Sequence, residues 1–337
     1  MSGVFGVEGL GLRIGDARIL DDVTWSVDRG ETLGIVGESG SGKSMSVLAA
    51  TGLLPRTKEV RLDGRSWLGG DAPVENLLTL DAERLRRLRG PRIGFVFQDP
   101  ATSLNPLLSV ERQLTEGLEE HRGMTRREAG RRAVELLELV GIPDPERRLR
   151  SYPHQLSGGM RQRVMIAIAL SCDPEVLVAD EPTTALDVTI QAQILDVVAD
   201  LQDRLGTAVV WISHDLGVVG GIADRIAVLY GGQVVETGDV RDIFAGHRHP
   251  YTAGLLASRP RLGHRAEDLA TIPGSPPDPR HLPDGCVFYD RCTLRSDERC
   301  ATERPLLARP AGAADGHLVR SFCAEHEPPA GSAGTAS

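Results

Sequence analysis

The chain has 337 residues, a formal net charge of −9 and a hydrophobic content of 41%. This length predicts about two domains, with ample apolar content for a buried core. The net negative charge argues against a general nucleic-acid-binding protein, because such domains are usually basic. No apolar run approaches the roughly 18–20 residues of a membrane span, and residues 1–10 lack the pattern of a secretory signal. We therefore expect a cytosolic chain.

Strand patterns come first along the chain. Short alternating stretches at residues 7–12 and 19–25 predict a small antiparallel sheet. Farther on, buried-strand patterns alternate with helical ones up to about residue 230, which predicts an α/β core with a mostly parallel sheet. The clearest of these strands are expected at residues 32–36, 92–97, 176–179, 207–212 and 226–229.

Helical patterns dominate between residues 101 and 156. Apolar residues keep helical spacing from Arg127 to Val140, and Gly141 supplies a C-cap. The basic stripe on this segment is most simply a solvated helix face; its members are Arg126, Arg127, Arg131 and Arg132. Beyond residue 238 the composition shifts, with a turn-rich connection at 271–285 and a tail at 328–337 that we expect to be disordered.

One of only two lysines in the chain, Lys43, stands in the segment GESGSGKS at residues 37–44. This is the G-x-x-x-x-G-K-[ST] phosphate-binding loop, and it lies between a predicted strand and a helix expected at residues 45–51. Glycines let backbone N–H groups converge on phosphates, Lys43 neutralises them, and the Ser44 hydroxyl suits Mg²⁺. The segment therefore predicts a site for a nucleoside triphosphate with magnesium, formed by Gly37, Glu38, Ser39, Gly40, Ser41, Gly42, Lys43 and Ser44.

Four further motifs follow the loop in chain order. Gln98 follows the strand at 92–97, LSGG at residues 156–159 opens a helix, Asp180-Glu181 ends a strand, and His214 follows another strand. Each is weak evidence alone, but together with the phosphate-binding loop they resemble the ATP-binding cassette (ABC) ATPases. The resemblance covers about residues 5–240. It implies a RecA-like P-loop domain with a small antiparallel β subdomain and a helical subdomain at about 101–163.

The resemblance also implies roles for these residues. Glu181 is the expected catalytic base, with His214 and Gln98 beside the γ-phosphate, and Asp180, Gln98 and Ser44 are the expected magnesium contacts. Ser157, Gly158 and Gly159 would complete the ATP site of a second cassette in a head-to-tail dimer, with residues 184–187 at the same junction. Family members place an aromatic residue over the adenine where this chain has Ile14, so Ile14 or another group would cover the base.

A second resemblance concerns the C-terminal part. QDPATSLNP at 98–106, HPYTAGLL at 249–256 and IPGSPP at 272–277 are similar to the ATPase subunits of the oligopeptide/dipeptide and nickel importers. We expect residues 1–240 to form the nucleotide-binding domain and residues 241–327 the extension typical of that branch. His247 and His249 are more simply explained by a surface turn before Pro250 than by a metal site.

Four of the five cysteines lie in this extension, at Cys286, Cys292, Cys300 and Cys323. In a reducing cytosol such a set favours a metal site or free thiols over disulfides. Similar tails in this branch hold a [4Fe–4S] cluster in some members, so we expect one here; free thiols and zinc remain the alternatives. Cys172 is expected to be a packed small residue.

The resemblance predicts the ATP-hydrolysing subunit of a peptide importer. Its expected partners are a second ATPase subunit, identical or a paralogue, two transmembrane permease subunits and an extracytoplasmic solute-binding protein, with no nucleic acid. The subunit would lie on the cytoplasmic face of the membrane, held by the permeases. A nickel or glutathione importer is an alternative, and a soluble ABC ATPase outside transport is a more distant one.

Overall fold

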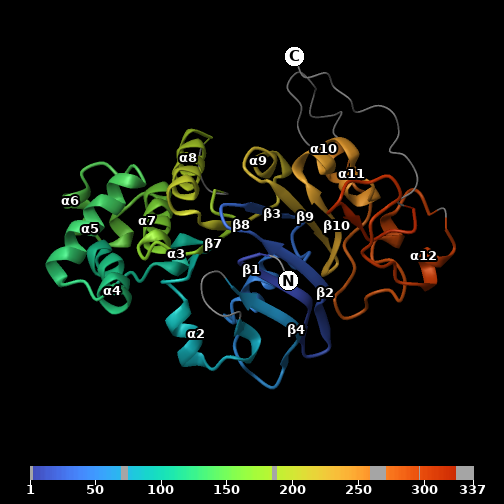
Figure 1. The fold of residues 1–337 in the computed structure, drawn as a ribbon, viewed down its shortest axis with the longest axis horizontal. Coiled ribbons are helices and arrows are strands. Elements are labelled where there is room, and N and C mark those ends of the chain that lie inside the picture. Colours follow the sequence, from blue (N-terminus) through green and yellow to red (C-terminus); the bar gives the residue numbers. More distant parts are fainter. Residues whose placement is uncertain (1–2, 70–74, 184–187, 259–270, 296, 324–337) are drawn as a thin grey trace, which may run out of the picture. The chain divides into compact units, whose positions relative to one another are not determined.

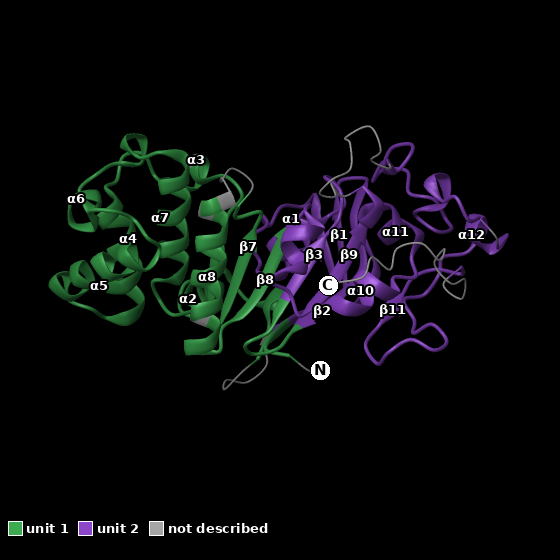
Figure 2. Cartoon of the chain, turned by 90° about the horizontal axis from the view of Figure 1, so that it is seen from above, with its two compact units in different colours: residues 1–5, 27–32, 68–212 green, residues 6–26, 33–67, 213–337 purple. Residues whose placement is uncertain are grey.

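The computed structural model of the chain describes residues 3–69, 75–183, 188–258, 271–295 and 297–323. The chain divides into two compact units, each formed from several separate segments (Figure 2). One unit holds residues 1–5, 27–32 and 68–212, and the other holds residues 6–26, 33–67 and 213–337. We refer to them as unit 1 and unit 2.

Figure 1 labels most of the helices and strands. The strands are β1 (Phe5–Ile14), β2 (Ala17–Val27), β3 (Thr32–Val36), β4 (Val60–Leu68), β5 (Glu75–Asn76), β6 (Ile93–Val96), β7 (Val176–Asp180), β8 (Ala208–Ser213), β9 (Arg225–Tyr230), β10 (Gln233–Asp239) and β11 (Leu318–Val319). The helices are α1 (Lys43–Ala50), α2 (Ala82–Leu88), α3 (Pro100–Ser103), α4 (Val110–Arg122), α5 (Arg126–Leu139), α6 (Pro145–Leu149), α7 (Gly158–Leu170), α8 (Val188–Leu205), α9 (Leu216–Gly220), α10 (Val240–Gly246), α11 (Pro250–Ala257) and α12 (Arg299–Thr302).

In unit 1, strands β6, β7 and β8 run parallel, with Val96 opposite Ala179 and Asp180 opposite Ile212. All residues of β7 and β8 are buried, which explains why both segments are continuous apolar runs without alternation. Because parallel strands end at the same edge of a sheet, the residues that follow β6 and β7 come together there.

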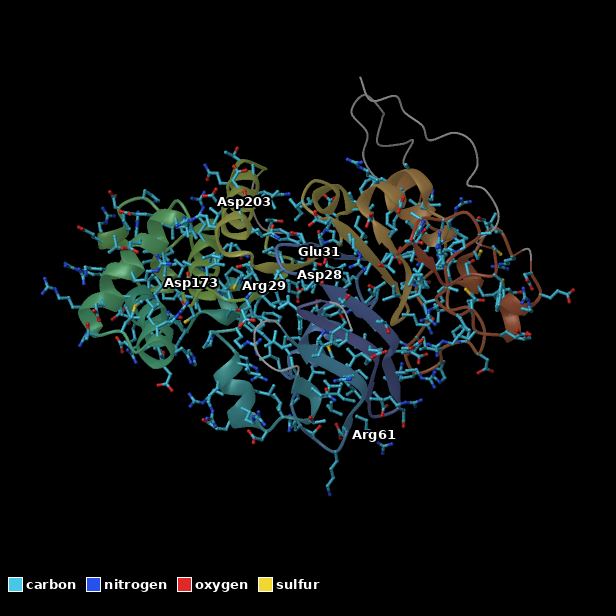
Figure 3. The ribbon with its side chains drawn as sticks, in the orientation of Figure 1. Asp28, Arg29, Glu31, Arg61, Asp173 and Asp203 are labelled. Carbon is cyan, nitrogen blue, oxygen red and sulfur yellow. The ribbon has the colours of Figure 1, made fainter. Side chains whose placement is uncertain are left out.

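Helices α3 to α7 form the helical part of unit 1, in which α7 packs against β6, α4 and α5. Thr125 and Glu128 form a capping box at the start of α5. In the expected solvated stripe on α5, Arg132 pairs with Asp173 at 3.2 Å; Figure 3 labels Asp173. Arg122 of α4 reaches the same carboxylate at 2.9 Å, so one half-buried acid links α4 and α5 to the segment that follows α7.

Unit 2 contains two groups of strands. β1 lies between β2 and β4 in one sheet, and only Gly15 and Asp16 separate β1 from β2, so these two strands form an antiparallel hairpin. In the other group β3 runs parallel to β9, which forms a hairpin with β10 around Gly231 and Gly232. β11 from the C-terminal region adds antiparallel to β10.

A buried carboxylate ties the C-terminal region to this second group. Glu236 of β10 lies beside a register shift in the hairpin and is 0% exposed. It accepts hydrogen bonds from the backbone N–H groups of Arg248 and His249, at 2.6 and 3.1 Å, and its Oε1 lies 2.8 Å from His317 Nε2. Burial opposes ionisation, but the hydrogen bonds outweigh it and lower the pKa of Glu236.

The observed elements match the sequence-based expectations closely for the strands and for the helix after Thr125. One expectation was wrong. The histidines expected on a surface turn are buried, His247 at 8% and His249 at 1% exposure, because the carboxylate of Glu236 binds the chain that carries them. The basic stripe on α5 is solvated as expected, with Arg126, Arg127 and Arg131 exposed and Arg132 half-buried in its ion pair. Among the described residues, no helix has the length and apolar character needed to span a membrane.

The buried imidazole of His249 predicts a pH dependence of stability. Burial lowers its pKa from 6.5 to about 4. Between these values the unfolded chain binds more protons than the folded chain, so the free energy of unfolding falls as the pH is lowered, by about 3 kcal/mol at most for this group.

The variant His249→Asn tests this. His249 N-caps α11, with Nδ1 accepting from Tyr251 N at 3.1 Å, and Asn retains that acceptor while it removes the titrating ring. Chemical denaturation between about pH 7 and 4 should show a shallower pH slope in the variant than in the natural chain, with His247 accounting for a remainder. An unchanged slope would contradict the assignment.

Candidate functional site

The phosphate-binding loop connects β3 to α1 in unit 2 and depends on glycine for its shape. Gly37, Gly40 and Gly42 have φ values of 154°, 80° and 102°, a region that other residues enter only at a cost. A Cβ at Gly37 would lie 2.2 Å from the Leu229 carbonyl oxygen, and one at Gly42 would lie 2.8 Å from Leu20 Cδ2. The backbone carbonyl requires glycine at position 37 by close approach as well as by conformation, whereas at position 42 the Leu20 side chain can move and the positive φ is the stronger requirement.

Lys43 lies inside the loop and is only 5% exposed. Its Nζ donates to the carbonyl oxygens of Gly37 at 2.8 Å and Glu38 at 3.0 Å. A buried ammonium requires partners of this kind, and an ammonium has three donors that can rotate toward a phosphate oxygen. Lys43 is thus held where the loop wraps around it.

The N-terminus of α1 is the second part of the phosphate-binding site. Its N-cap is Gly42, which offers no side-chain acceptor to the first turn. The backbone N–H groups of that turn therefore suit an anion, with the helix dipole adding to the attraction. Ser44 lies in the same turn and carries the hydroxyl expected at Mg²⁺. The residues fit a nucleoside triphosphate and its metal.

A separate acidic group lies at the carboxyl edge of the unit 1 strands. Asp180 is the last residue of β7 and is 5% exposed. Glu181 follows it, and its Oε2 accepts a hydrogen bond from Gln98 Nε2 at 3.2 Å. Gln98, which comes shortly after β6, is thus brought to Glu181 by the parallel pairing of β6 and β7. Carboxylate and amide oxygens are ligands that Mg²⁺ prefers.

Glu181 has an unusual backbone. Its φ is 46°, in the left-handed region that costs a non-glycine residue roughly 1–2 kcal/mol. Its backbone N–H donates to the Ile212 carbonyl at 3.0 Å, and Gln162 of α7 donates from Nε2 to the Pro182 carbonyl at 2.6 Å. Strain of this kind concentrates at functional positions, and the two bonds hold the carboxylate in place.

The LSGG segment begins α7 in unit 1. Ser157 is its N-cap, and the hydroxyl accepts from Met160 N at 3.3 Å. Ser157 and Gly158 are exposed, and a Cβ at Gly158 would meet nothing within 4 Å. This start of a helix therefore faces open space and can receive an anion from another molecule.

The remaining predicted residues are placed as follows. His214 directly follows β8 and is exposed, and Ile14 ends β1 and is half-buried; both belong to unit 2. Gln98, Asp180, Glu181 and the LSGG segment belong to unit 1, and the phosphate-binding loop to unit 2 (Figure 2). Residues 184–187, expected at the dimer junction, lie outside the described residues.

The predicted four-cysteine ligand set is formed only in part. Cys300 and Cys323 are buried with their sulfurs 4.0 Å apart, and the backbone N–H of Cys286 donates to the Cys300 carbonyl. In the described part of the chain, however, no three His, Cys, Asp or Glu side chains are grouped as a metal site would require. A [4Fe–4S] cluster needs four convergent thiolates, and the described side chains form no such group as placed.

Burial explains the chemistry of these thiols. It raises the pKa of Cys286 to about 11, with Cys292 and Cys323 adding to the effect. It likewise raises the pKa of Cys300 to about 12, with Cys323 nearby. Both are therefore thiols at neutral pH. Cys172 is buried against Gly117, whose carbonyl lies 3.6 Å from its sulfur, as expected for a packed small residue.

Comparison with known proteins agrees with this geometry. Residues 20–184 match the ABC transporter family, and residues 235–300 match the C-terminal region of oligopeptide/dipeptide transporters. Among solved structures, the ATP-binding cassette MJ0796, a dimer in a post-hydrolysis state with ADP and Pi, has a TM-score of 0.62 at 31% identity over 70% of this chain and 99% of that one. The cbiO1 protein of Clostridium perfringens has a TM-score of 0.59 at 28% identity, over 73% and 92%.

Similarity to curated proteins extends through the C-terminal extension. The oligopeptide transport ATP-binding protein OppD of Bacillus subtilis (strain 168) is 47% identical over 316 residues, which is 94% of this chain and 86% of that protein. A putative peptide import ATP-binding protein of Brucella abortus (strain 2308) is 50% identical over 297 residues, covering 88% and 87%. The fold and site define an ABC-type ATPase. The chain belongs to the ABC transporter family, in its oligopeptide/dipeptide transporter branch.

Two glycines of the phosphate-binding loop give a matched test of its geometry. Gly40→Ala meets open space and should lower the free energy of unfolding by only about 1–2 kcal/mol, the cost of a left-handed alanine. Gly37→Ala adds the clash with the Leu229 carbonyl, a backbone atom that cannot rotate away, so it should cost at least about 1 kcal/mol more. Chemical denaturation of both variants measures the difference, and equal losses would contradict the described loop.

Proposed function

We propose that this chain is the ATPase subunit that energises uptake of di- and oligopeptides across the cytoplasmic membrane. The observation that carries the proposal is the extension: it matches the C-terminal region of oligopeptide/dipeptide transporters and follows a complete set of cassette motifs in one chain. The names of the relatives, an oligopeptide transport protein and a putative peptide import protein, support the solute class.

The proposed organisation has residues 1–240 as the nucleotide-binding domain, with a helical subdomain at about 101–163. Residues 241–327 are the extension, and residues 328–337, expected to be a disordered tail, lie outside the described residues. This division follows the cassette motifs, and the family match in the C-terminal region at residues 235–300 supports the boundary. It separates the chain by function, whereas the compact units separate it by packing.

The proposed chemistry is hydrolysis of MgATP. The loop at residues 37–44 binds the phosphates, Lys43 neutralises their charge, and Ser44, Asp180 and Gln98 hold Mg²⁺. Glu181 orients and deprotonates the attacking water, with His214 beside the γ-phosphate and Ile14 against the adenine. The strained backbone at Glu181 and its bond from Gln98 support these roles, because they fix a carboxylate at the edge of the strands.

The proposed assembly is a head-to-tail dimer of two ATPase subunits, identical or paralogous, on two transmembrane permeases with an extracytoplasmic solute-binding protein. The subunit lies on the cytoplasmic face. In the dimer, Ser157, Gly158 and Gly159 act on the ATP of the opposing subunit. The exposure of Ser157 and Gly158 at the start of α7 supports this role, and the similar MJ0796 cassette is described as a dimer.

A nickel or glutathione importer is the alternative within transport. A soluble ABC ATPase is disfavoured by the match at residues 235–300, since the matching model describes the C-terminal region of oligopeptide/dipeptide transporters. The ATPase chain alone does not select the solute, so uptake assays with the assembled complex must compare peptide, nickel and glutathione.

Replacement of the proposed base is the first test of mechanism. Glu181→Gln should retain MgATP binding while the steady-state ATPase rate of the assembled complex falls about 10²–10⁴-fold, the usual contribution of a general base. Glu138→Gln, at an exposed position of α5, is the control and should hydrolyse ATP normally. ATPase activity of Glu181→Gln near the natural rate would falsify the assignment.

Replacement in the LSGG segment tests the action between subunits. Ser157→Arg places a bulky cation at the exposed helix start, so it should abolish turnover in the complex. MgATP affinity of the isolated chain should change less than about twofold, since the residue contacts the nucleotide of the opposite subunit. Calorimetric titration measures the affinity, and loss of binding by the isolated variant would show that Ser157 acts on its own site.

The iron–sulfur cluster is the finer part of the proposal. It rests on the four cysteines of the extension and on the contact of Cys300 with Cys323. Closure around a cluster would require Cys286 and Cys292 to converge on that pair, since the described thiols form no such group. No step of ATP hydrolysis depends on it.

Anaerobic purification followed by iron and sulfide analysis tests the cluster. About four of each per chain are expected, with loss of both in Cys292→Ser and retention in Cys172→Ser, the buried cysteine outside the extension. One equivalent of zinc without sulfide, or four thiols that react freely in the folded chain, would reject the cluster in favour of the corresponding alternative.

A further inference from the structure

The extension reaches the phosphate-binding loop directly, at Glu38. The backbone N–H of Glu38 donates to the Tyr251 hydroxyl at 2.8 Å. Its carboxylate receives both terminal nitrogens of Arg291, with Nη1 2.6 Å from Oε2 and Nη2 3.0 Å from Oε1. Its carbonyl accepts from Lys43 Nζ. The same carbonyl accepts from the Ser41 backbone N–H at 3.2 Å. Every polar group of Glu38 is therefore bonded, and two of its four partners, Tyr251 and Arg291, come from the extension.

Arg291 is built into the protein more firmly than a surface arginine. Its side chain is 5% exposed, and besides Glu38 it donates to the carbonyls of Ile272 and Pro273, at 3.1 and 2.8 Å, and to the Tyr230 hydroxyl at 3.3 Å. The hydrogen bonds to Glu38 raise its pKa further. Paired, planar contact of this kind fixes direction as well as distance, which a lysine does not do.

Aromatic packing supports the same contact. Tyr251, Tyr230 and Phe288 form a cluster with ring centroids 4.6 to 5.5 Å apart. Phe288 and Arg291 both lie on the loop between Cys286 and Cys292. This cysteine loop thus supplies one aromatic ring and one guanidinium to the residues that hold Glu38.

Two other arginines of the extension also form ion pairs with the rest of unit 2, so an ion pair alone does not distinguish Arg291. Arg304 pairs with Asp21 at 2.7 Å and Arg320 with Asp22 at 2.9 Å. These fasten the extension to β2. Arg291 differs because its partner, Glu38, belongs to the phosphate-binding loop itself. Glu38 directly follows Gly37, and the loop depends on the backbone conformation of Gly37.

We propose that Arg291 is a positioning residue for ATP binding: through Glu38 it holds the phosphate-binding loop in its binding conformation, and so couples the cysteine loop to the nucleotide site. The proposal rests on the proposed function, since it concerns how that same loop binds MgATP. A loop that Arg291 and Tyr251 already hold in place loses little conformational freedom when the nucleotide binds. The entropic cost of binding is therefore smaller, and part of the affinity for MgATP depends on the extension. By linkage, bound nucleotide must stabilise the cysteine loop by the same factor.

A double-mutant cycle on the full chain tests this. The variants are Arg291→Gln, Glu38→Gln and the two combined, with MgATP affinity measured by calorimetry. Each single change should raise Kd about 5–20-fold, within the usual range of coupling between sites, and the double variant should be no weaker than the weaker single one. Arg291→Gln that binds within twofold of the natural chain, or changes that add fully, would overturn the proposal.

The matched control is Arg320→Gln. It removes another buried arginine of the extension, with 2% exposure, whose carboxylate partner lies outside the loop. It should lower thermal stability and leave Kd for MgATP within about twofold, so general loosening of the extension is separated from positioning. If Arg291→Gln does not unfold cooperatively, Arg291→Lys takes its place in the cycle, since it keeps the charge and loses the two-pronged contact.

Hydrogen exchange supplies a readout that a merely structural role would not move. MgATP should slow amide exchange at residues 286–292 in the natural chain and have little effect there in Glu38→Gln; equal protection in both would overturn the coupling. Lys43→Ala separates failure of the proposed function from failure of the positioning role alone. If the natural chain binds MgATP no better than Lys43→Ala, the proposed function fails; if it binds well and Arg291→Gln binds equally, only the positioning role fails.

Discussion

The backbone of the phosphate-binding loop is the constraint on which the rest of unit 2 depends. The loop has its shape only while Gly37, Gly40 and Gly42 keep positive φ, and the Leu229 carbonyl leaves no room for a Cβ at Gly37. Lys43 donates a hydrogen bond to the Gly37 carbonyl inside the loop, and Glu38 connects the loop to Arg291 of the extension. A strained segment persists where its surroundings determine it at several points, and here those points come from β9, α11 and the extension.

The acidic group of unit 1 is held in a comparable way. Glu181 occupies a left-handed conformation, and bonds to Ile212 and from Gln98 hold it there. The parallel pairing of β6 with β7 explains why residues 83 positions apart meet. In the phosphate-binding loop and in the acidic group alike, buried strands supply rigidity and the residues that follow them carry the chemistry, as is usual for open α/β sheets.

Sequence reasoning located the parts that have a local signal. Buried strands such as Val176–Asp180 are apolar runs of the right length, and the loop at residues 37–44 has its own motif. The contact of Arg291 with Glu38 spans 253 positions, and no spacing rule indicates it. For a similar reason the sequence did not predict the burial of His249, because that burial depends on a hydrogen bond to Glu236, which lies beside a register shift in the hairpin. The cluster was expected from the resemblance to similar cysteine-bearing tails, but such a resemblance does not make thiols converge; in the described residues the sulfur of Cys300 contacts that of Cys323.

The central claim is that this chain converts ATP hydrolysis into peptide uptake. Proteoliposomes that contain the chain with its permease subunits, with ATP inside the lumen that faces the chain and the solute-binding protein outside, test it most directly. The account predicts that accumulation of a labelled oligopeptide depends on ATP and is lost with Lys43→Ala, whereas nickel and glutathione do not accumulate. Peptide accumulation that is the same with Lys43→Ala, or uptake of nickel or glutathione in place of peptide, would contradict it.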